Sequence, residues 1–296
     1  MPQAKRSKLE YRFRKYLVLP IKILRLSIVD TIRQDGVEHA GYLAFLSLLS
    51  FFPFLILLIS IIGFFGASEI GAQFVHLIIS ATPPEMADAL NPRIEEITSA
   101  PPQSFLTIAI LGVIWTASSS VEGCRTILNR AYRVAFPPPY IFRRLISIAE
   151  FFAIVFAIIV GIFVFIVIPS FFEGVNTASV FKFYVDFDFL YIRHLAIFIL
   201  LTCTTSLLYF ALPNAKQKIS QTVPGSILTV ALWLAIEKLF SIYLNNFHQF
   251  NLVYGSLAGM MISLMFFYLI SLIFILGAEF NYHFHRTYQI FLKERR

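Results

Sequence analysis

The sequence predicts an all-α fold: a polytopic membrane protein with six transmembrane helices, an N-terminal interfacial helix and a small helical outer loop. Apolar side chains make up 58% of the 296 residues and charged ones only 14%, against roughly 25% charged in soluble domains. The mean hydropathy is +0.75. Six apolar segments are each long enough to cross a hydrocarbon layer of about 30 Å, which takes roughly 20 helical residues. These segments are about 41–66, 104–122, 145–172, 190–212, 222–245 and 254–282.

Lysines and arginines cluster on alternate connections between these segments, and this distribution predicts the orientation of the chain. Twenty of the 24 lie before residue 34, in 123–144, in 213–221 or after residue 282. With an even number of spans all four regions lie on one side, and the positive-inside rule makes that side cytoplasmic. We therefore expect a basic cytoplasmic arm with an interfacial helix at 1–38, a transmembrane domain at 39–285 with its outer loop at 67–103, and a basic cytoplasmic tail at 286–296.

Two helices are expected outside the spans. Residues 20–38 carry an apolar stripe with cations on the other faces, which suits a helix lying in the inner membrane interface or, equally, a helix packed on the bundle. In the outer loop, a Thr-x-x-Glu pattern at 82–85 reads as a capping box and predicts a short helix there. The stripe in the first of these helices consists of Ile21, Leu24, Ile28 and Ile32.

The first span contains a proline at its centre, in FLSLLSFFPFLILLI at 45–59. An interior proline costs a soluble helix about 3 kcal/mol or more, because it removes a hydrogen bond and clashes with the preceding turn. In a membrane, neighbouring helices and hydroxyls such as that of Ser50 can satisfy the freed backbone groups. A kink at Pro53 would present polar backbone to a substrate at mid-membrane, as in transporters, or it would only improve helix packing.

Two adjacent charges, Glu237 and Lys238, lie in the fifth span, in LWLAIEKLF. They sit about 16 residues past Thr222, roughly 24 Å into the span, and charges at such depth are costly unless they pair or face water. Successive helix residues point about 100° apart, so the two cannot both face the same lipid. We expect Glu237 to face the bundle beside Trp233 and Ser241, and Lys238 to snorkel outward. The alternative is a purely structural role for both.

Further charges gather at the expected cytoplasmic ends of the spans. Glu122, Glu150 and Glu279 each lie there on a different span, close to arginines, and form either an inner gate or proton relay, or ordinary ion pairs that pin helix ends. We expect the basic 123–144 connection to contact anionic headgroups or gather an anionic substrate. Its arginines are Arg125, Arg130, Arg133, Arg143 and Arg144. The candidate residues of a substrate pathway are Ser50, Pro53, Glu237, Lys238 and Glu279.

The sequence indicates no catalytic residues. A nuclease needs a metal cluster or an acid and a base around a phosphate, and the histidines form no HxHxD run and have no acidic cluster beside them. His283 and His285 are two residues apart, so on a helix they point about 200° apart, away from a shared metal. A GxxxxGK[ST] loop is absent as well. We therefore expect no enzymatic activity, no ATPase, no metal and no cofactor.

Four local strings, taken together, resemble the YihY/BrkB family of bacterial inner-membrane proteins. They are HAGYLAFLSLLSFFP at 39–53, SVEGCRTILNRAY at 120–132, LPNAKQKISQTVPGS at 212–226, and YGSLAG with LGAEFN in the last span. The resemblance covers roughly residues 30–285 in the same order. It implies a six-helix, multi-pass protein of the bacterial plasma membrane. Members of this family carry the labels ribonuclease and virulence factor, and transport or envelope-lipid roles have also been suggested for them.

These features predict a transporter or lipid-handling protein for an anionic or amphipathic envelope substrate. The alternative is a non-transporting scaffold that organises envelope lipids or a protein partner, and a membrane nuclease is the least favoured interpretation. A polar cavity reaching Glu237 would favour transport, and a dry, packed interior would favour the scaffold. The expected partners are membrane lipids, especially anionic headgroups, with a homo-oligomer as a further option and no nucleic acid.

Overall fold

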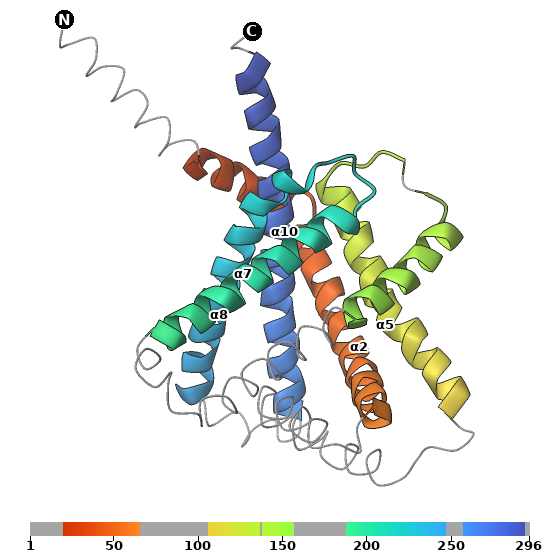
Figure 1. Ribbon diagram of the computed structural model, residues 1–296. Helices are drawn as coiled ribbons and strands as arrows, with labels where there is room; N and C mark the ends of the chain where they lie inside the picture. Colours follow the sequence, from red (N-terminus) through yellow and green to blue (C-terminus); the bar gives the residue numbers. More distant parts are fainter. Residues whose placement is uncertain (1–19, 66–105, 137, 157–187, 247–256, 294–296) are drawn as a thin grey trace, which may run out of the picture.

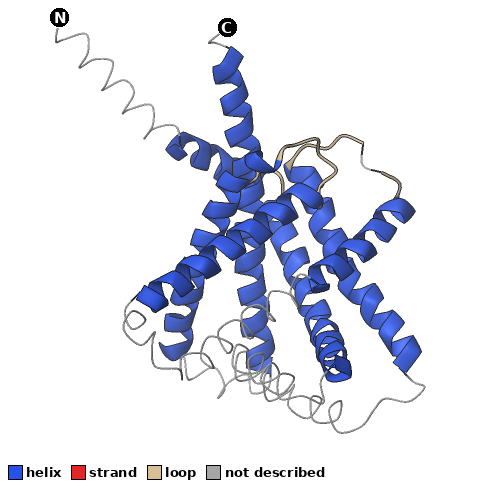
Figure 2. Ribbon diagram, in the orientation of Figure 1, coloured by secondary structure: helices blue, strands red, loops and turns tan. Residues whose placement is uncertain are grey.

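The structure of the protein is a computed structural model that describes residues 20–65, 106–136, 138–156, 188–246 and 257–293 (Figure 1). Within these residues the regular elements are helices, and no strand occurs (Figure 2). The all-α fold class is therefore confirmed for the described part of the chain. The predicted outer loop at 67–103 lies outside the described residues, as do the first 19 residues and the last three.

The helices follow one another along the chain and meet through short connections at one end of the bundle (Figure 1). A helical stretch at 20–33 leads through a tight turn into α2 (Gly36–Phe65), and α5 (Leu106–Ala131) is followed by a helical stretch at 140–156. The chain continues with α7 (Asp188–Ala211), the 3-10 helix η1 (Ile219–Gln221), α8 (Val223–Asn246) and α10 (Leu257–Lys293). α10 thus extends into the region predicted as a tail.

α10 is the central helix of the bundle and packs against α2, α5 and α8, while α7 packs against α8 (Figure 1). Two buried apolar clusters lie between these helices. One cluster joins α5 and the 140–156 helix to α7 and α10, and it includes Leu128, Phe151, Tyr209 and Phe274. The other joins α2, α5 and α10, and it consists of Ala40, Leu43, Ile127 and Ile275.

α8 crosses α10 where two glycines face each other. A Cβ atom on Gly277 would lie 1.9 Å from Thr229 Oγ1, and one on Gly225 would lie 2.2 Å from the carbonyl oxygen of Gly277. Residues without a Cβ atom are what allows two helices to approach this closely. The backbone N–H of Gly225 also donates a hydrogen bond to Asn281 Oδ1 at 2.6 Å, so a polar contact fixes the same crossing.

Two helical stretches of the described residues, Val223–Leu244 and Gly259–Thr287, are long and apolar enough to cross a membrane. They correspond to the fifth and sixth predicted spans, and the other four spans stay a prediction. Large apolar side chains are exposed along the bundle, as expected of helices that face lipid. Examples are Phe45, Leu49, Trp115, Phe156 and Met260.

The helical stretch 20–33 has one face packed on the bundle and another face exposed. Ile23, Ser27 and Thr31 are buried at four-residue spacing. The predicted apolar stripe points away from the bundle, because Ile21 and Ile32 are exposed. Packing on the bundle, one of the two options left open by the sequence, is therefore observed, and the opposite face has the apolar character that an interfacial helix needs.

Candidate functional site

The end of the bundle that carries the 132–139 and 212–222 connections, called the inner end below, holds most of the buried charges. Its geometry begins with the end of α5. The N–H of Arg133 donates to the carbonyl of Arg130 at 3.0 Å, and that of Val134 to the carbonyl of Asn129 at 2.8 Å, which is the pattern of a Schellman cap. Glycine is usual at the Arg133 position, because a positive φ costs other residues roughly 1–2 kcal/mol. Here φ is 58°, so the backbone at Arg133 is strained. A residue stays in such a conformation when the surrounding structure holds it there.

The guanidinium of Arg133 joins three segments of the chain. It donates to both carboxylate oxygens of Glu279 on α10, at 2.8 and 2.9 Å, and to Asp30 at 3.1 Å. His283, one helical turn after Glu279, contacts the same Asp30 oxygen at 2.9 Å. Asp30, Arg133, Glu279 and His283 are called the Arg133 cluster below. Since bidentate arginine–carboxylate pairs are among the strongest hydrogen-bonded contacts, this cluster ties residues 20–33 and the end of α5 to α10.

Arg133 keeps its charge in this environment. Burial would lower the pKa of the guanidinium, but the hydrogen bonds and the negative charge of Glu279, with a smaller contribution from Asp30, raise the pKa above its ordinary value. The ring of Tyr282 adds a cation–π contact, with its centroid 4.4 Å from the guanidinium carbon. The cluster therefore contains a permanent cation between two carboxylates.

Asp30, Glu279 and His283 each offer a metal-ligand atom, and these atoms lie within 4.8 Å of one another. Arg133 already pairs with both carboxylates. A metal ion would have to displace the guanidinium, whose positive charge already compensates the two acids. The group is therefore an ion-pair cluster, and its geometry does not support a metal centre.

A second ion-pair group pins α5 to the 140–156 helix. Arg125, which is 1% exposed, pairs with Glu150 and donates to the carbonyl of Leu212 at 2.9 Å. Ser147 accepts a hydrogen bond from Arg125 at 3.2 Å and donates one to Glu122 at 2.8 Å. Glu122 and Glu150 therefore form ion pairs, as one of the two predicted arrangements expects, but inside their helices and not at helix ends. Glu279 belongs to the separate Arg133 cluster.

Two of the five arginines predicted to contact lipid headgroups are buried, and the prediction is wrong for them. Arg125 is enclosed as described, and Arg144 is 6% exposed, donates to the carbonyl of Trp115 at 2.6 Å and stacks 4.1 Å above its ring. Arg125 is paired with carboxylates inside the bundle, whereas Arg144 is held by the Trp115 carbonyl, the Ser119 hydroxyl and the Trp115 ring. Arg133 and Arg143 face carboxylates at the inner end, and Arg130 is exposed.

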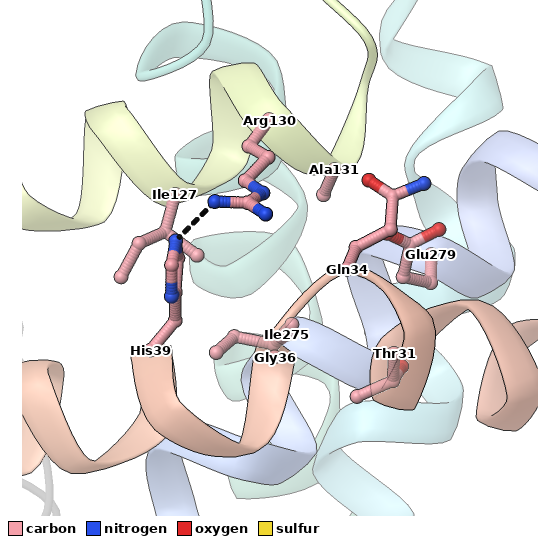
Figure 3. A pocket seen from close by; sticks show the side chains of 9 residues that line it. All are labelled: Thr31, Gln34, Gly36, His39, Ile127, Arg130, Ala131, Ile275 and Glu279. Carbon is pink, nitrogen blue, oxygen red and sulfur yellow. Dashed lines mark hydrogen bonds between the residues drawn. The ribbon is translucent and has the colours of Figure 1, made fainter.

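A small pocket opens at the inner end between the start of α2, the end of α5 and α10 (Figure 3). Arg130 and His39 stand on one side, 3.1 Å apart, and Gln34 and Glu279 stand on the other. The free space inside the pocket is only about 10 Å³, about what one water molecule needs. A phosphate or carboxylate headgroup would therefore fit only after the elements around the pocket move apart. Its remaining walls are Thr31, Gly36, Ile127, Ala131 and Ile275.

The protonation state of His39 follows from its surroundings. Burial and the neighbouring Arg130 lower the pKa of His39 below its ordinary value, and they outweigh the opposing effects of Asp35 and Glu38. His39 is therefore uncharged at neutral pH, and its Nε2 accepts the hydrogen bond from Arg130. Arg130 in turn pairs with Asp35, so the cation beside the pocket is partly compensated by this carboxylate.

The predicted pathway residues lie at separate places in the described part of the chain. Ser50 is buried and its hydroxyl lies 2.6 Å from both the carbonyl oxygen of Leu46 and the hydroxyl of Ser120. α2 continues through Pro53 as a single helix, and the hydroxyl of Ser120 reaches the same Leu46 carbonyl at 2.9 Å. These contacts place Ser50 in a helix–helix interface, as the packing interpretation of Pro53 expects.

Glu237 does not face the bundle, so that expectation is wrong. Both Glu237 and Lys238 are exposed on the outward side of α8. The side of α8 that faces α10 is occupied by aromatic residues: Trp233 donates to the carbonyl of Ile270 at 3.0 Å, and Phe240 packs 5.1 Å from the ring of Phe266. Glu279 is the predicted pathway residue that lies both at the pocket and in a buried charge cluster.

Asp30, His39 and His283 are site residues that the sequence reasoning missed. One local signal was available for His283: it follows Glu279 by four residues, so both side chains lie on one face of α10. Asp30 and His39 carried no such signal, because their partners are about 100 and 90 residues away in the sequence, at Arg133 and Arg130. Their role depends on how the turn at 34–35 places the 20–33 helix.

The comparisons with known proteins agree with the helical membrane architecture. The family described as "Virulence factor BrkB" matches residues 28–295. The chain is 29% identical over 187 residues to the ribonuclease-like protein YfkH of Bacillus subtilis (strain 168), covering 61% of this chain and 66% of that protein. It is 36% identical over 72 residues to the UPF0761 membrane protein VV0203 of Vibrio vulnificus (strain YJ016), covering 24% of this chain and 23% of that protein.

A second membrane relative shows a match of similar extent. The UPF0761 membrane protein PA0951 of Pseudomonas aeruginosa (strain PAO1) is 36% identical over 73 residues, covering 25% of this chain and 18% of that protein. The matches thus span less than two thirds of each of these three relatives. No solved structure matches the chain significantly. Since the family match covers most of the sequence and relatives are membrane proteins by name, the chain is a membrane protein that belongs to the BrkB family.

Proposed function

We propose that the chain is a six-pass protein of the bacterial inner membrane that moves an anionic, amphipathic envelope substrate. Most of the described lysines and arginines lie in the 20–33 helix, in the 123–144 and 213–221 connections or in the last turns of α10, and these regions lie at one end of the bundle (Figure 1). The positive-inside rule makes this inner end cytoplasmic, and both chain ends with it. The sequence contains no nucleotide-binding loop, so the movement would be passive or driven by a gradient. The proposal includes no enzymatic activity.

The inner pocket is the observation that carries this proposal. It brings an exposed arginine, an uncharged histidine and a buried carboxylate to one opening, in the residues Arg130, His39 and Glu279. Ionisable groups in membrane proteins are costly and commonly mark substrate or ion pathways. Arg130 supplies the positive charge that attracts a phosphate or carboxylate headgroup, while the apolar outer surface of the helices suits the rest of an amphiphile.

The Arg133 cluster would serve as the gate of this pocket. Glu279 lines the pocket and is also the bidentate partner of Arg133. To open the pocket toward the interior of the bundle, the 20–33 helix must separate from α10, which breaks the contacts of Asp30 with Arg133 and with His283. Such ion pairs can alternate between two arrangements, which is what a gate requires.

A non-transporting scaffold is the second candidate, and the tight inner packing favours it. The Gly225–Gly277 crossing leaves no room for movement between α8 and α10. Beside it, the hydroxyl of Tyr209 lies 2.8 Å from that of Thr229 and donates to the carbonyl of Phe274 at 2.7 Å. A scaffold needs this rigidity, whereas in a transporter the rigid half would have to be the fixed part against which α2 and the 20–33 helix move.

Reconstituted vesicles distinguish the two candidates. The probe is fluorescent phosphatidylglycerol, whose movement between leaflets is followed by chemical quenching from outside. We expect the wild-type protein to accelerate this movement and Arg130→Gln to slow it at least about tenfold, since a hydrogen bond to a charged group contributes about 1.5–3 kcal/mol. Lys216→Gln, an exposed cation elsewhere on the inner side, is the matched control. A wild-type protein that leaves the movement at the rate of empty vesicles would support the scaffold.

A further inference from the structure

Glu279 belongs to both the Arg133 cluster and the inner pocket. It is 1% exposed and lies in the apolar stretch Gly259–Thr287, which is long enough to cross a membrane. Both of its oxygens accept hydrogen bonds from Arg133, at 2.8 and 2.9 Å. Two accepting oxygens are what an ionised carboxylate offers, because a protonated one carries an O–H donor. The structure therefore contains Glu279 in its charged form, held by Arg133.

The Arg133 cluster contains more acids than permanent cations. Asp30 and Glu279 share one guanidinium, that of Arg133. A neutral His283 suffices for its contact with Asp30, because one ring N–H can donate to the carboxylate. With His283 uncharged, the cluster has one excess negative charge, and a single proton makes it neutral. If Glu279 takes this proton, Arg133 keeps Asp30 at 3.1 Å and the ring of Tyr282 as partners, so its charge stays compensated.

The pocket connects Glu279 with the inner side of the bundle. Its free space of about 10 Å³ is about what one water molecule needs, and Arg130 on its other side is exposed. A water molecule in this space would bring a proton to the carboxylate without a passage through the apolar part of the bundle. The charged and titratable groups that face Glu279 in the described part of the chain are those of Asp30, His39, Arg130, Tyr132, Arg133 and His283.

The arrangement of the pocket makes the binding of an anion and of a proton depend on each other. Arg130 and His39 stand on one side of the pocket, and Glu279 stands on the other (Figure 3). A phosphate attracted by Arg130 would face the charged carboxylate across a narrow space, and like charges repel strongly where little water separates them. Protonation of Glu279 removes this repulsion, and its O–H can donate a hydrogen bond to the phosphate. By linkage, each of the two ligands then raises the affinity for the other.

Protonation of Glu279 would also loosen the walls of the pocket. The end of α5 and α10 are two of these walls, and the bidentate pair of Arg133 with Glu279 ties them together. A neutral carboxyl group loses the charge-assisted part of both hydrogen bonds. The end of α5 can then separate from α10, which a headgroup requires before it fits.

We propose that the anionic substrate moves together with a proton, and that Glu279 carries this proton. The inference rests on the proposed function and names the gradient that drives it. In the closed arrangement Glu279 is charged and paired with Arg133, and joint binding of the anion and the proton opens the pocket. One anion with one proton carries no net charge across the membrane. A pH difference therefore drives the movement, and a membrane potential does not.

Vesicles of phosphatidylcholine with a trace of fluorescent phosphatidylglycerol test this coupling. Chemical quenching from outside gives the distribution of the probe between the leaflets, first with a pH difference of about one unit and then with a potassium diffusion potential. We expect the wild-type protein to enrich the probe about tenfold on the alkaline side, because one pH unit is a tenfold ratio of proton concentrations, and to ignore the potential. Empty vesicles give the background, and Lys216→Gln, an exposed cation elsewhere on the inner side, should behave as the wild type.

Two substitutions of Glu279 separate its proton from its place in the packing. Glu279→Gln has no titratable group and should lose the response to the pH difference, whereas Glu279→Asp keeps a carboxyl group and should retain it. Equal loss in both variants, or a wild-type response in Glu279→Gln, would overturn the assignment to Glu279.

The wild-type measurement tests the coupling independently of how well the variants fold. Wild-type movement that follows the potential and ignores the pH difference would overturn the proton coupling and leave the proposed function standing. A wild-type protein that moves no lipid under any of these conditions would overturn both.

Discussion

Replacing Arg133 with alanine should destabilise the protein by about 3 kcal/mol. The side chain of Glu279 is 2% exposed and that of Arg133 is 25% exposed. Without the guanidinium, a buried carboxylate loses both of its charge-assisted hydrogen bonds. Breaking a buried ion pair in this way costs about 3–5 kcal/mol, and partial access of solvent to Arg133 places the expected value at the lower end. Asp30 is affected less, because His283 still contacts it.

Two further variants divide this cost between its physical causes. Arg133→Gly loses the same ion pairs but relieves the positive φ of 58°, so it should be about 1–2 kcal/mol more stable than Arg133→Ala. Adding Glu279→Gln to Arg133→Ala removes the unpaired buried charge. The double variant should therefore be no less stable than Arg133→Ala alone. The effect of the double substitution should then be about 2–3 kcal/mol smaller than the sum of the two single effects, and this difference is the coupling energy between the two side chains.

Reversible unfolding in mixed micelles, followed by far-ultraviolet circular dichroism, measures these differences. The wild type, the three variants and the single Glu279→Gln variant complete the cycle. Two results would refute the reasoning. Equal stability of the alanine and glycine variants would show that the backbone at position 133 is not strained. Strictly additive effects of Arg133→Ala and Glu279→Gln would show that the two side chains do not depend on each other.

Two other variants test the helix crossing and the pocket. Gly277→Ala should lower the free energy of unfolding by at least about 3 kcal/mol or prevent folding, because its Cβ atom would meet Thr229 Oγ1 at 1.9 Å. Gly41→Ala is the control in the same unfolding assay. It should be neutral or slightly stabilising, because the space around its Cβ position is open. His39 has a lowered pKa in the folded protein, so the unfolded chain binds the proton more tightly than the folded one. The contribution of neutral His39 to the free energy of unfolding is therefore fully present above the ordinary pKa of histidine. It is lost as the pH falls below that value. His39→Asn should therefore reduce the loss of stability between about pH 8 and pH 5, and an unchanged pH profile would contradict the assignment.

The sequence predicted the helical architecture because the length of an apolar segment is a local property. The fifth span, expected at 222–245, corresponds closely to α8 (Val223–Asn246). Helix ends were less predictable. α10 was expected to end near residue 282 but reaches Lys293, because a change from apolar to polar side chains marks the membrane boundary and does not by itself interrupt helical hydrogen bonds. Charge and hydropathy thus predict spans better than they predict helix ends.

The face that each helix turns to the bundle was predicted less well, and Glu237 shows why. The expectation depended on Trp233 and Ser241 lying on the same side of α8. Trp233 does contact α10, but Glu237, one helical turn further along, is exposed. Which sector of α8 is covered depends on the width and position of the surface that α10 offers, and that surface is set by the Gly225–Gly277 crossing. A long-range contact of this kind has no signature within a single span.

The partner of Glu279 was equally hidden, although the sequence around Arg133 contained an indirect signal. The apolar periodicity of α5 stops near NRAYRV, yet no glycine stands there to end the helix, and the next strong helix breakers are the prolines at 137–139. A helix that ends without its usual residue conflicts with local preference, and such conflicts occur mainly where tertiary contacts or function require a specific side chain. The residue at that end, Arg133, is the one that binds Glu279 and Asp30. The absence of a glycine at a helix end therefore indicated which arginine of the basic connection organises the inner end of the bundle.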